Sequence, residues 1–182
     1  MVDKDKQEKS QKVKDKQAET IFKWWASLEN NRGDRAQLRR CEKPGDVMIQ
    51  PAFHRLMHLL GEERKQPAIE LATLAGILSH VQGNKKDARF AGQLGTPPEK
   101  GGNPVMSESR FQQLLKSKDW NELYLRLRRA VIMLKRQVNI TSVSRCIQDW
   151  GWEFKGRYHE NPSKRLQFRL AEEYYKEVLK KK

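Results

Sequence analysis

The chain has 182 residues, 33% of them charged and 37% hydrophobic, and its 37 lysines and arginines outnumber its 23 acidic residues to give a formal charge of +14. This length suits one domain, or two helical lobes that share a core, without a separate catalytic domain. No apolar stretch approaches the roughly 18–20 residues that span a bilayer, and the N-terminus does not resemble a secretion signal, so we expect a cytoplasmic protein with no membrane association.

The N-terminal segment 1–18 differs in composition from the rest of the chain. It contains six lysines and four acidic residues but almost no large apolar side chain. Such a segment buries too little surface to offset the entropy lost on ordering. We therefore expect a disordered or frayed lead over 1–18, followed by a single all-helical domain over 19–182.

The first predicted helix begins near Glu19, where apolar side chains start to recur at helical spacing through FKWWASLE. The residues NNRG that follow are typical of a helix end. A short basic segment comes next, and the pair Pro44-Gly45 predicts a loop.

Two apolar helices are predicted in the middle of the chain. Pro51 suits the first turn of one, which Gly61 closes. The other runs from about Pro67 to Val81 and has so little polar surface that it should be central. Residues 82–104 are rich in glycine and proline and form the longest segment predicted to be irregular.

The C-terminal part of the chain predicts four more helices. One follows Ser107, a suitable N-cap, and the clearest spans Trp120–Val138, with apolar side chains at steps of three and four residues. The others cover about 141–150 and 162 to the end. No stretch alternates with the period of a strand, so the predicted fold is an all-α, compact multi-helix bundle in one lobe or two.

Motifs for catalysis and metal binding are weak. His54 and His58 lie four residues apart, but HRLMH lacks the glutamate of a metalloprotease helix, and histidines that form hydrogen bonds or face solvent explain the pair. The glycines of RFAGQLG lack the context of a phosphate loop and are interpreted as loop glycines. Cys41 and Cys146 form no zinc or disulfide motif. We expect no enzyme activity, no metal and no cofactor.

The tryptophans offer possible stacking surfaces for unpaired bases. Trp25 and Trp120 lie on apolar helix faces and are predicted to belong to the core. Trp152 lies at a predicted helix end among basic residues, and a stacking role there stays open.

The positive charge is concentrated in the C-terminal two-fifths, where residues 110–182 contain 18 basic and 8 acidic side chains. Basic pairs such as Arg39-Arg40, Arg128-Arg129 and Lys135-Arg136 flank apolar helical positions, where long side chains also pack without binding anything. As a set they lack acidic neighbours at helical spacing. Contact with the phosphate backbone of a nucleic acid is the favoured interpretation, with strong dependence on salt.

Several segments together resemble the CasB family, the small subunit of the type I-E CRISPR surveillance complex called Cascade. They occur in the family's order and cover most of residues 19–155. The resembling segments are FKWWASLE, RAQLRRCEKPGDVMIQPAFHRLMHLLG, ESRFQQLL, LYLRLRRAV and the Trp-Gly pair of QDWGW.

The resemblance implies a non-catalytic helical subunit, typically present as two copies, that contacts the backbone and large subunits of the complex. It also implies contacts with the guide RNA, the target strand and the displaced strand of an R-loop in antiviral defence. By matched position, the resemblance places strand-contacting residues at Arg40, Arg110, Lys116 and Arg129, with Arg39, Arg128 and Lys155 as weaker candidates.

An alternative function remains open from the residues alone. A free-standing basic helical module that binds RNA or a protein partner would have the same charge and helical pattern. Such a module should bind nucleic acid tightly without neighbouring subunits.

Overall fold

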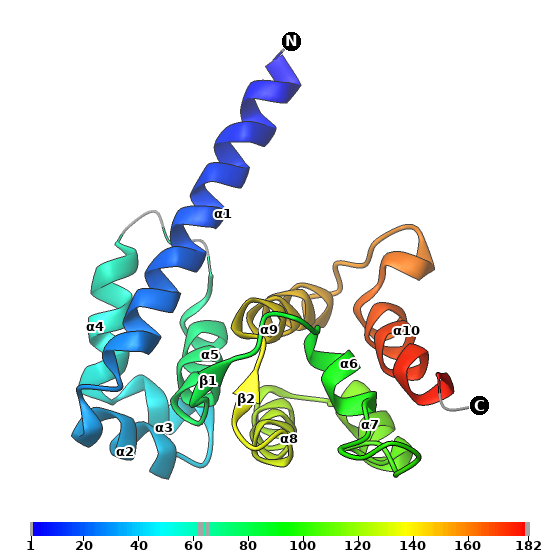
Figure 1. Ribbon diagram of the computed structural model, residues 1–182. Helices are drawn as coiled ribbons and strands as arrows, with labels where there is room; N and C mark the ends of the chain where they lie inside the picture. Colours follow the sequence, from blue (N-terminus) through cyan, green and yellow to red (C-terminus); the bar gives the residue numbers. More distant parts are fainter. Residues whose placement is uncertain (1, 62–63, 65, 181–182) are drawn as a thin grey trace.

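The computed structural model describes residues 2–61, 64 and 66–180 (Figure 1). Helices dominate this part of the chain, and none of them is long and apolar enough to cross a membrane. The elements are α1 (Val2–Ser27), α2 (Arg32–Arg40), α3 (Pro44–Met48), α4 (Pro51–Leu60), α5 (Ala68–Ser79), β1 (Gly83–Asn84), α6 (Phe90–Gly95), α7 (Glu108–Leu115), α8 (Trp120–Met133), β2 (Gln137–Val138), α9 (Ile140–Phe154), the 3₁₀ turn η1 (Pro162–Lys164) and α10 (Leu166–Leu179).

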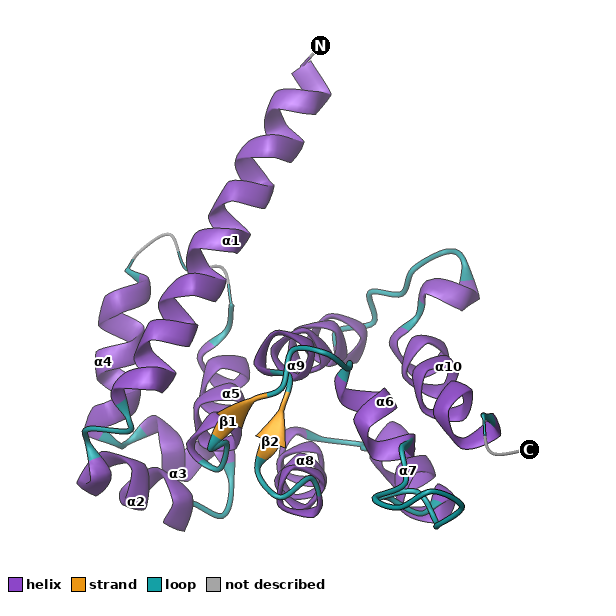
Figure 2. Cartoon of the chain, viewed as in Figure 1, coloured by secondary structure: helices purple, strands orange, loops and turns teal. Residues whose placement is uncertain are grey.

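The predicted all-α class is confirmed, with one small addition. The two-residue strands β1 and β2 pair in parallel, with Gly83 opposite Gln137 and Asn84 opposite Val138 (Figure 2). Sequence periodicity does not detect strands this short, because two residues show no alternation.

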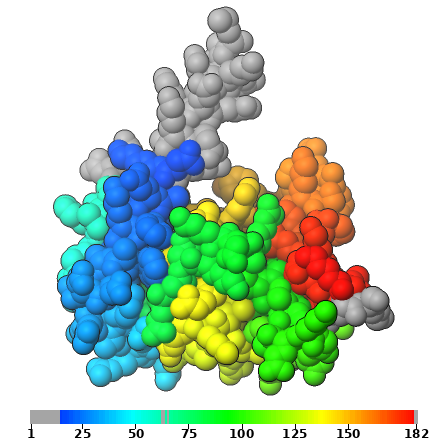
Figure 3. All heavy atoms as spheres, viewed as in Figure 1, coloured from blue at the N-terminus to red at the C-terminus, as the bar shows by residue number. Residues whose placement is uncertain are grey.

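The helices form two groups that share one core. Helices α1–α5 lie on one side of Figure 1 and α6–α10 on the other, and α5 packs against both α8 and α9 between them. The residues from Glu70 to Ser79 of α5 are all buried, which confirms its predicted central position. Buried apolar side chains from both groups form one continuous cluster. In the space-filling view, the segment around residues 85–110 covers the middle of one face, between α1–α3 and α10 (Figure 3).

Helix α1 begins at Val2 instead of near Glu19, so the structure extends it through the lysine-rich lead. Lysine, glutamine and glutamate have high intrinsic helix propensity, which an analysis based on burial underestimates. The apolar end of α1 is anchored as predicted: Trp25 is buried and its indole N–H donates to the carbonyl of Val81 at 3.2 Å. The division of the chain at residue 18 stays a prediction.

The segment between α1 and α4 is helical where a basic stretch and a loop were expected. Helix α2 buries only Leu38, so it has no apolar periodicity to detect. Pro44 occupies the first turn of α3 instead of a loop, and the Asp46 carboxylate accepts from the backbone N–H groups of Glu42 at 3.1 Å and Lys43 at 3.2 Å.

The prediction of an irregular segment over 82–104 is wrong for residues 90–95, which form α6. The glycines of RFAGQLG are therefore helical, not loop, glycines. A Cβ added at Gly95 would lie 2.3 Å from the backbone oxygen of Tyr174, so α6 and α10 pack closely at this position. Glycine is required here by close approach, which a single sequence does not distinguish from a turn.

Helix α8 ends at Met133, five residues before the predicted end at Val138, and Val138 is buried in β2. Lys135 and Arg136 both adopt left-handed backbone conformations, with φ of 52° and 64°. The N–H of Arg136 donates to Val131 O at 3.0 Å, and that of Lys135 to Ile132 O at 2.9 Å. This Schellman motif normally carries glycine at the position of Lys135, so the sequence lacked the usual stop signal.

Candidate nucleic-acid interface

Helices α7 and α8 form a groove of about 370 Å³ on the surface. Arg110 from α7 and Arg126 and Arg129 from α8 line it over an apolar floor that includes Leu114 and Ile132. Arg126 and Arg129 are three positions apart and therefore share a face of α8. The structure thus brings together two of the predicted site residues, Arg110 and Arg129.

The three arginines of this α7/α8 groove differ in their partners. Arg126 is held in place, because its guanidinium donates to Gln113 O at 2.7 Å and contacts the Glu122 carboxylate at 3.0 Å. Arg110 and Arg129 are exposed and have no hydrogen-bond or ion-pair partner within the described residues. Two guanidinium groups therefore remain available to a phosphate.

A second basic group, which we call the arginine–His80 cluster, consists of Arg39, Arg128, Arg136 and His80. Arg39 comes from α2, His80 caps the C-terminus of α5, Arg128 comes from α8, and Arg136 lies in the turn after α8. Nε of Arg39 donates to Ser79 O at 2.8 Å. Two weaker candidates, Arg39 and Arg128, are thereby brought together around a histidine that is only 3% exposed.

The electrostatics of the arginine–His80 cluster are consistently positive. Burial, with the positive charges of Arg128, Arg136 and Arg39 adding to it, lowers the pKa of His80 to about 4, so the ring is neutral at pH 7. Burial also lowers the pKa of the Arg39 guanidinium, with Arg136 and Arg35 adding to the effect. The positive charges around His80 and Arg39 disfavour a further proton on either side chain and attract an anion.

The remaining predicted residues lie outside both basic groups. Arg40 is exposed at the last turn of α2, and Lys116 is exposed as the C-cap of α7. Lys155 is the C-cap of α9 and lines a cavity of about 740 Å³ together with Glu70. Burial raises the pKa of Glu70 to about 7, partly opposed by the positive charge of Lys155 and reinforced by Asp149.

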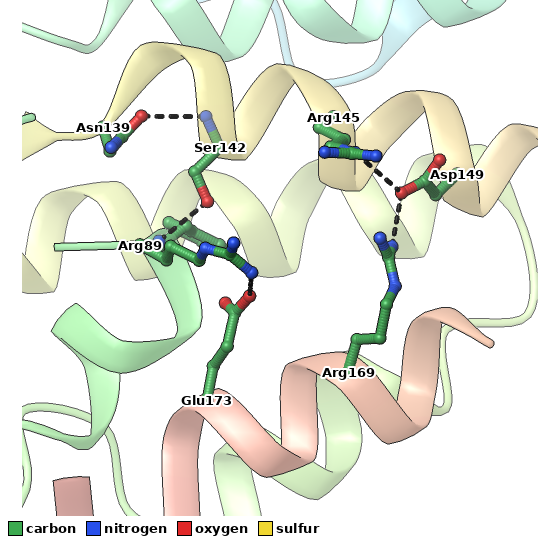
Figure 4. Close-up of polar contacts among 8 residues, drawn as sticks. Arg89, Asn139, Ser142, Arg145, Asp149, Arg169 and Glu173 are labelled. Atoms are coloured by element: carbon green, nitrogen blue, oxygen red, sulfur yellow. Dashed lines mark hydrogen bonds and ion pairs between the residues drawn. The ribbon is translucent and has the colours of Figure 1, made fainter. Parts of the chain in front are cut away.

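Three arginines on the α9/α10 side are paired with acidic side chains. Arg89 pairs with Glu173 at 2.9 Å, and both Arg145 and Arg169 contact Asp149 (Figure 4). These arginines have less charge to offer a polyanion than Arg110 and Arg129 of the α7/α8 groove. The excess charge of the C-terminal part is therefore distributed unevenly over its surface.

The aromatic predictions are confirmed where they concern the core. The ring of Trp120 packs edge-on against Trp150 at 4.7 Å between centroids, and it lies against the core cluster as Trp25 lies within it. Trp152 is 54% exposed, and the Arg157 guanidinium lies 4.8 Å from its ring centroid. His54 and His58 are exposed on α4, and among the described residues no three candidate metal ligands come together.

Sequence reasoning did not place Arg126 or His80 among the site residues, and it considered Arg136 only within the basic pair Lys135-Arg136. The helical phase links Arg126 to Arg129 and was available as a signal. No local pattern indicates that His80 and Arg136 meet, because their proximity depends on the backbone hydrogen bond from Gln82 N to Arg136 O at 2.8 Å.

The family model of the CRISPR-associated protein Cse2 matches residues 34–175. The fold is similar to a chain in the crystal structure of E. coli Cascade bound to a PAM-containing double-stranded DNA target, with a TM-score of 0.64 and 23% sequence identity over 88% of this chain and 95% of that chain. Among curated proteins, none matches the sequence at a significant level.

Proposed function

This chain belongs to the CRISPR-associated Cse2 family, also called CasB, and we propose that it is a non-catalytic subunit of a Cascade surveillance complex that stabilises the R-loop through phosphate contacts. The family membership confirms the resemblance found in the sequence. Pairing with the guide supplies sequence specificity in such complexes, while protein contacts to the backbone tip a nearly balanced strand exchange. A rigid basic surface without a base-reading motif suits that task.

The partners in this proposal are the guide RNA, the target strand and the displaced strand, together with the backbone and large subunits. The proposal also includes a second copy of the chain in the same complex, and it places the complex in the cytoplasm. The similar fold of a chain in DNA-bound E. coli Cascade supports assembly with protein and nucleic acid. The charge of +14 supports contact with polyanions.

One observation carries the proposal furthest: Arg110 and Arg129 are exposed, face the same groove and have no acidic partner within the described residues. Arg126 is fixed beside them by Gln113 O and Glu122, which makes the groove a defined surface. Guanidinium groups contact phosphate oxygens through two parallel N–H donors. The α7/α8 groove is therefore the proposed principal contact with a strand.

The experiment compares target-DNA retention by the assembled complex across a salt series. Arg110→Glu and Arg129→Glu should each weaken retention and reduce the slope of log affinity against log salt by about 0.7–0.9 for each lost phosphate contact. Arg40→Gln and Lys116→Gln test the two candidates at helix C-termini, where a glutamate would also oppose the helix dipole. Lys100→Glu in the loop after α6 is the matched control, because this lysine is exposed and lies outside any helix, and its replacement reverses the same charge.

Unchanged retention and an unchanged salt slope in Arg110→Glu and Arg129→Glu would contradict the proposed contact. Tight binding of nucleic acid by the isolated chain at physiological salt, without entry into the complex, would favour the free-standing module instead. Hydrolysis of nucleic acid by the purified chain, with or without divalent metal, would contradict the non-catalytic assignment.

A further inference from the structure

We propose that the arginine–His80 cluster binds a single phosphate-type oxyanion. This inference deepens and rests on the proposed function, under which the oxyanion is one phosphodiester group of a nucleic-acid strand. The site is separate from the α7/α8 groove. It includes His80, which neither the sequence nor the family resemblance indicated, and Arg136, which the sequence indicated only as part of the basic pair Lys135-Arg136.

The unmet donors of the cluster point to an anion. Nη2 of Arg39, Nη1 of Arg136 and both ring nitrogens of His80 are buried without a hydrogen-bond partner in the part of the chain that the structure describes. Because the His80 ring is neutral, one of its two nitrogens is an N–H donor and the other an acceptor, so the ring offers one donor to an anion. Nε of the neighbouring Arg35 is in the same condition. Buried donors are almost always paired in folded proteins, and leaving them unpaired is costly. One oxyanion supplies several acceptor lone pairs to these donors at once.

The charges around the arginine–His80 cluster also favour a bound anion. Arg128, Arg136 and Arg39 all act on His80, and Arg39 is itself acted on by Arg136 and Arg35. The neighbouring charges that shift the pKa values of His80 and Arg39 within the described chain are those of arginines. A bound anion relieves this repulsion, whereas a neutral ligand leaves it unchanged.

The backbone fixes the donors before a ligand arrives. Arg39 is oriented by its hydrogen bond to Ser79 O at 2.8 Å. Arg136 sits in the left-handed turn after α8, and its carbonyl accepts from Gln82 N at 2.8 Å and Gly83 N at 3.2 Å. Two consecutive left-handed residues other than glycine are strained, and such strain is found where a structure holds a functional group in position. Preorganisation of this kind favours binding of a small ion.

Phosphate chemistry fits the cluster better than a carboxylate. Three arginines from different elements all act on His80, and a tetrahedral oxyanion presents oxygens in several directions, whereas a carboxylate presents two in one plane. Neutral His80 contributes one N–H donor without adding charge. A phosphodiester and free phosphate share this chemistry, so the experiment must separate the two sources.

The test uses the wild-type full chain and follows the ring nitrogens of His80 by NMR, with the signal assigned by its loss in His80→Gln. Inorganic phosphate should produce a saturable shift that sodium chloride at equal ionic strength does not. An oligothymidylate with hydroxyl groups at both ends has only phosphodiesters, and it should produce a similar shift if a strand is the source. This measurement does not depend on whether an arginine variant folds.

Arg39→Gln and Arg136→Gln should weaken phosphate binding by about tenfold or more, because each removes a charge-assisted contact. Arg32→Gln is the matched control: it removes the same charge from an exposed position on α2 and should change affinity less than about twofold. Circular dichroism confirms that each variant is folded.

The outcomes separate this inference from the proposed function. A His80 shift with phosphate but not with the oligothymidylate supports the oxyanion site and overturns a strand as its source. No saturable shift with either probe, or an equal shift with chloride, overturns the site. Retention of DNA by the complex through the α7/α8 groove would still stand in that case, because it is measured with different residues.

Discussion

Replacing the buried carboxyl group of Glu70 should remove part of the loss of stability that the protein undergoes as pH rises. Glu70 is 6% exposed, and a Cβ added at Gly151 would lie 2.9 Å from its Oε2. Its native pKa of about 7 is above the ordinary value of 4.5, so the folded state keeps a proton that the unfolded chain loses. Native stability from this group is therefore full below about pH 4.5 and is lost as pH rises through 7.

The size of the effect follows from the two pKa values. At 1.36 kcal/mol for each pKa unit, the difference corresponds to about 3 kcal/mol, and solvent in the adjoining cavity reduces this to about 2 kcal/mol. Glu70→Gln keeps the shape but does not ionise. Compared with the wild type, the variant should therefore gain about 2 kcal/mol in free energy of unfolding between pH 5 and pH 8.5.

Urea unfolding followed by circular dichroism at the two pH values measures this gain directly. Glu172→Gln on α10 is the matched control, since it makes the same substitution at an exposed carboxyl and should show almost no change with pH. A stability difference between Glu70→Gln and the wild type that stays constant from pH 5 to pH 8.5 would refute the reasoning.

Three further predictions concern stability. Gly95→Ala should lower the free energy of unfolding by roughly 2–3 kcal/mol, because the new methyl group would overlap the backbone of Tyr174. Gly33→Ala, on the open face of α2, should raise the free energy of unfolding by about 0.5–1 kcal/mol. Chemical denaturation of both variants measures the two changes. Lys135→Gly should stabilise the protein by about 1 kcal/mol by relieving the left-handed backbone, measured as a rise in the urea midpoint. The depressed pKa of His80, about 4 against an ordinary 6.5, should make the wild type lose about 2 kcal/mol relative to His80→Gln as pH falls from 7 to 4, and the absence of such a loss would contradict the burial of a neutral ring.

The sequence predicted those parts of the fold in which apolar periodicity coincides with burial. Helices α4, α5 and α7 lie within a few residues of their predicted limits, since each buries a regular apolar face or is buried throughout. Helix α2 was missed because it contributes a single buried side chain, Leu38. The end of α8 was missed because Lys135 occupies a position at which glycine normally marks the stop.

The candidate site was predictable only in part, for a related reason. The sequence shows which side chains are basic, and helix phase shows which of them share a helix face. The family resemblance indicates Arg110 and Arg129, which the structure places in one groove. Composition does not indicate which basic side chains have acidic partners. That distinction depends on tertiary contacts such as Arg89 with Glu173, which are 84 positions apart.

The short parallel pairing of β1 with β2 has a consequence for the order of folding. Gly83 and Gln137 are 54 positions apart, and closing a loop of that length costs about 3–4 kcal/mol in chain entropy. The few backbone hydrogen bonds of this ladder, at about 1 kcal/mol each, do not offset that cost alone. The ladder should therefore form only after α5 has docked on α8 and α9, so its amide protons should report late kinetic events, while those of buried α5 become protected earlier.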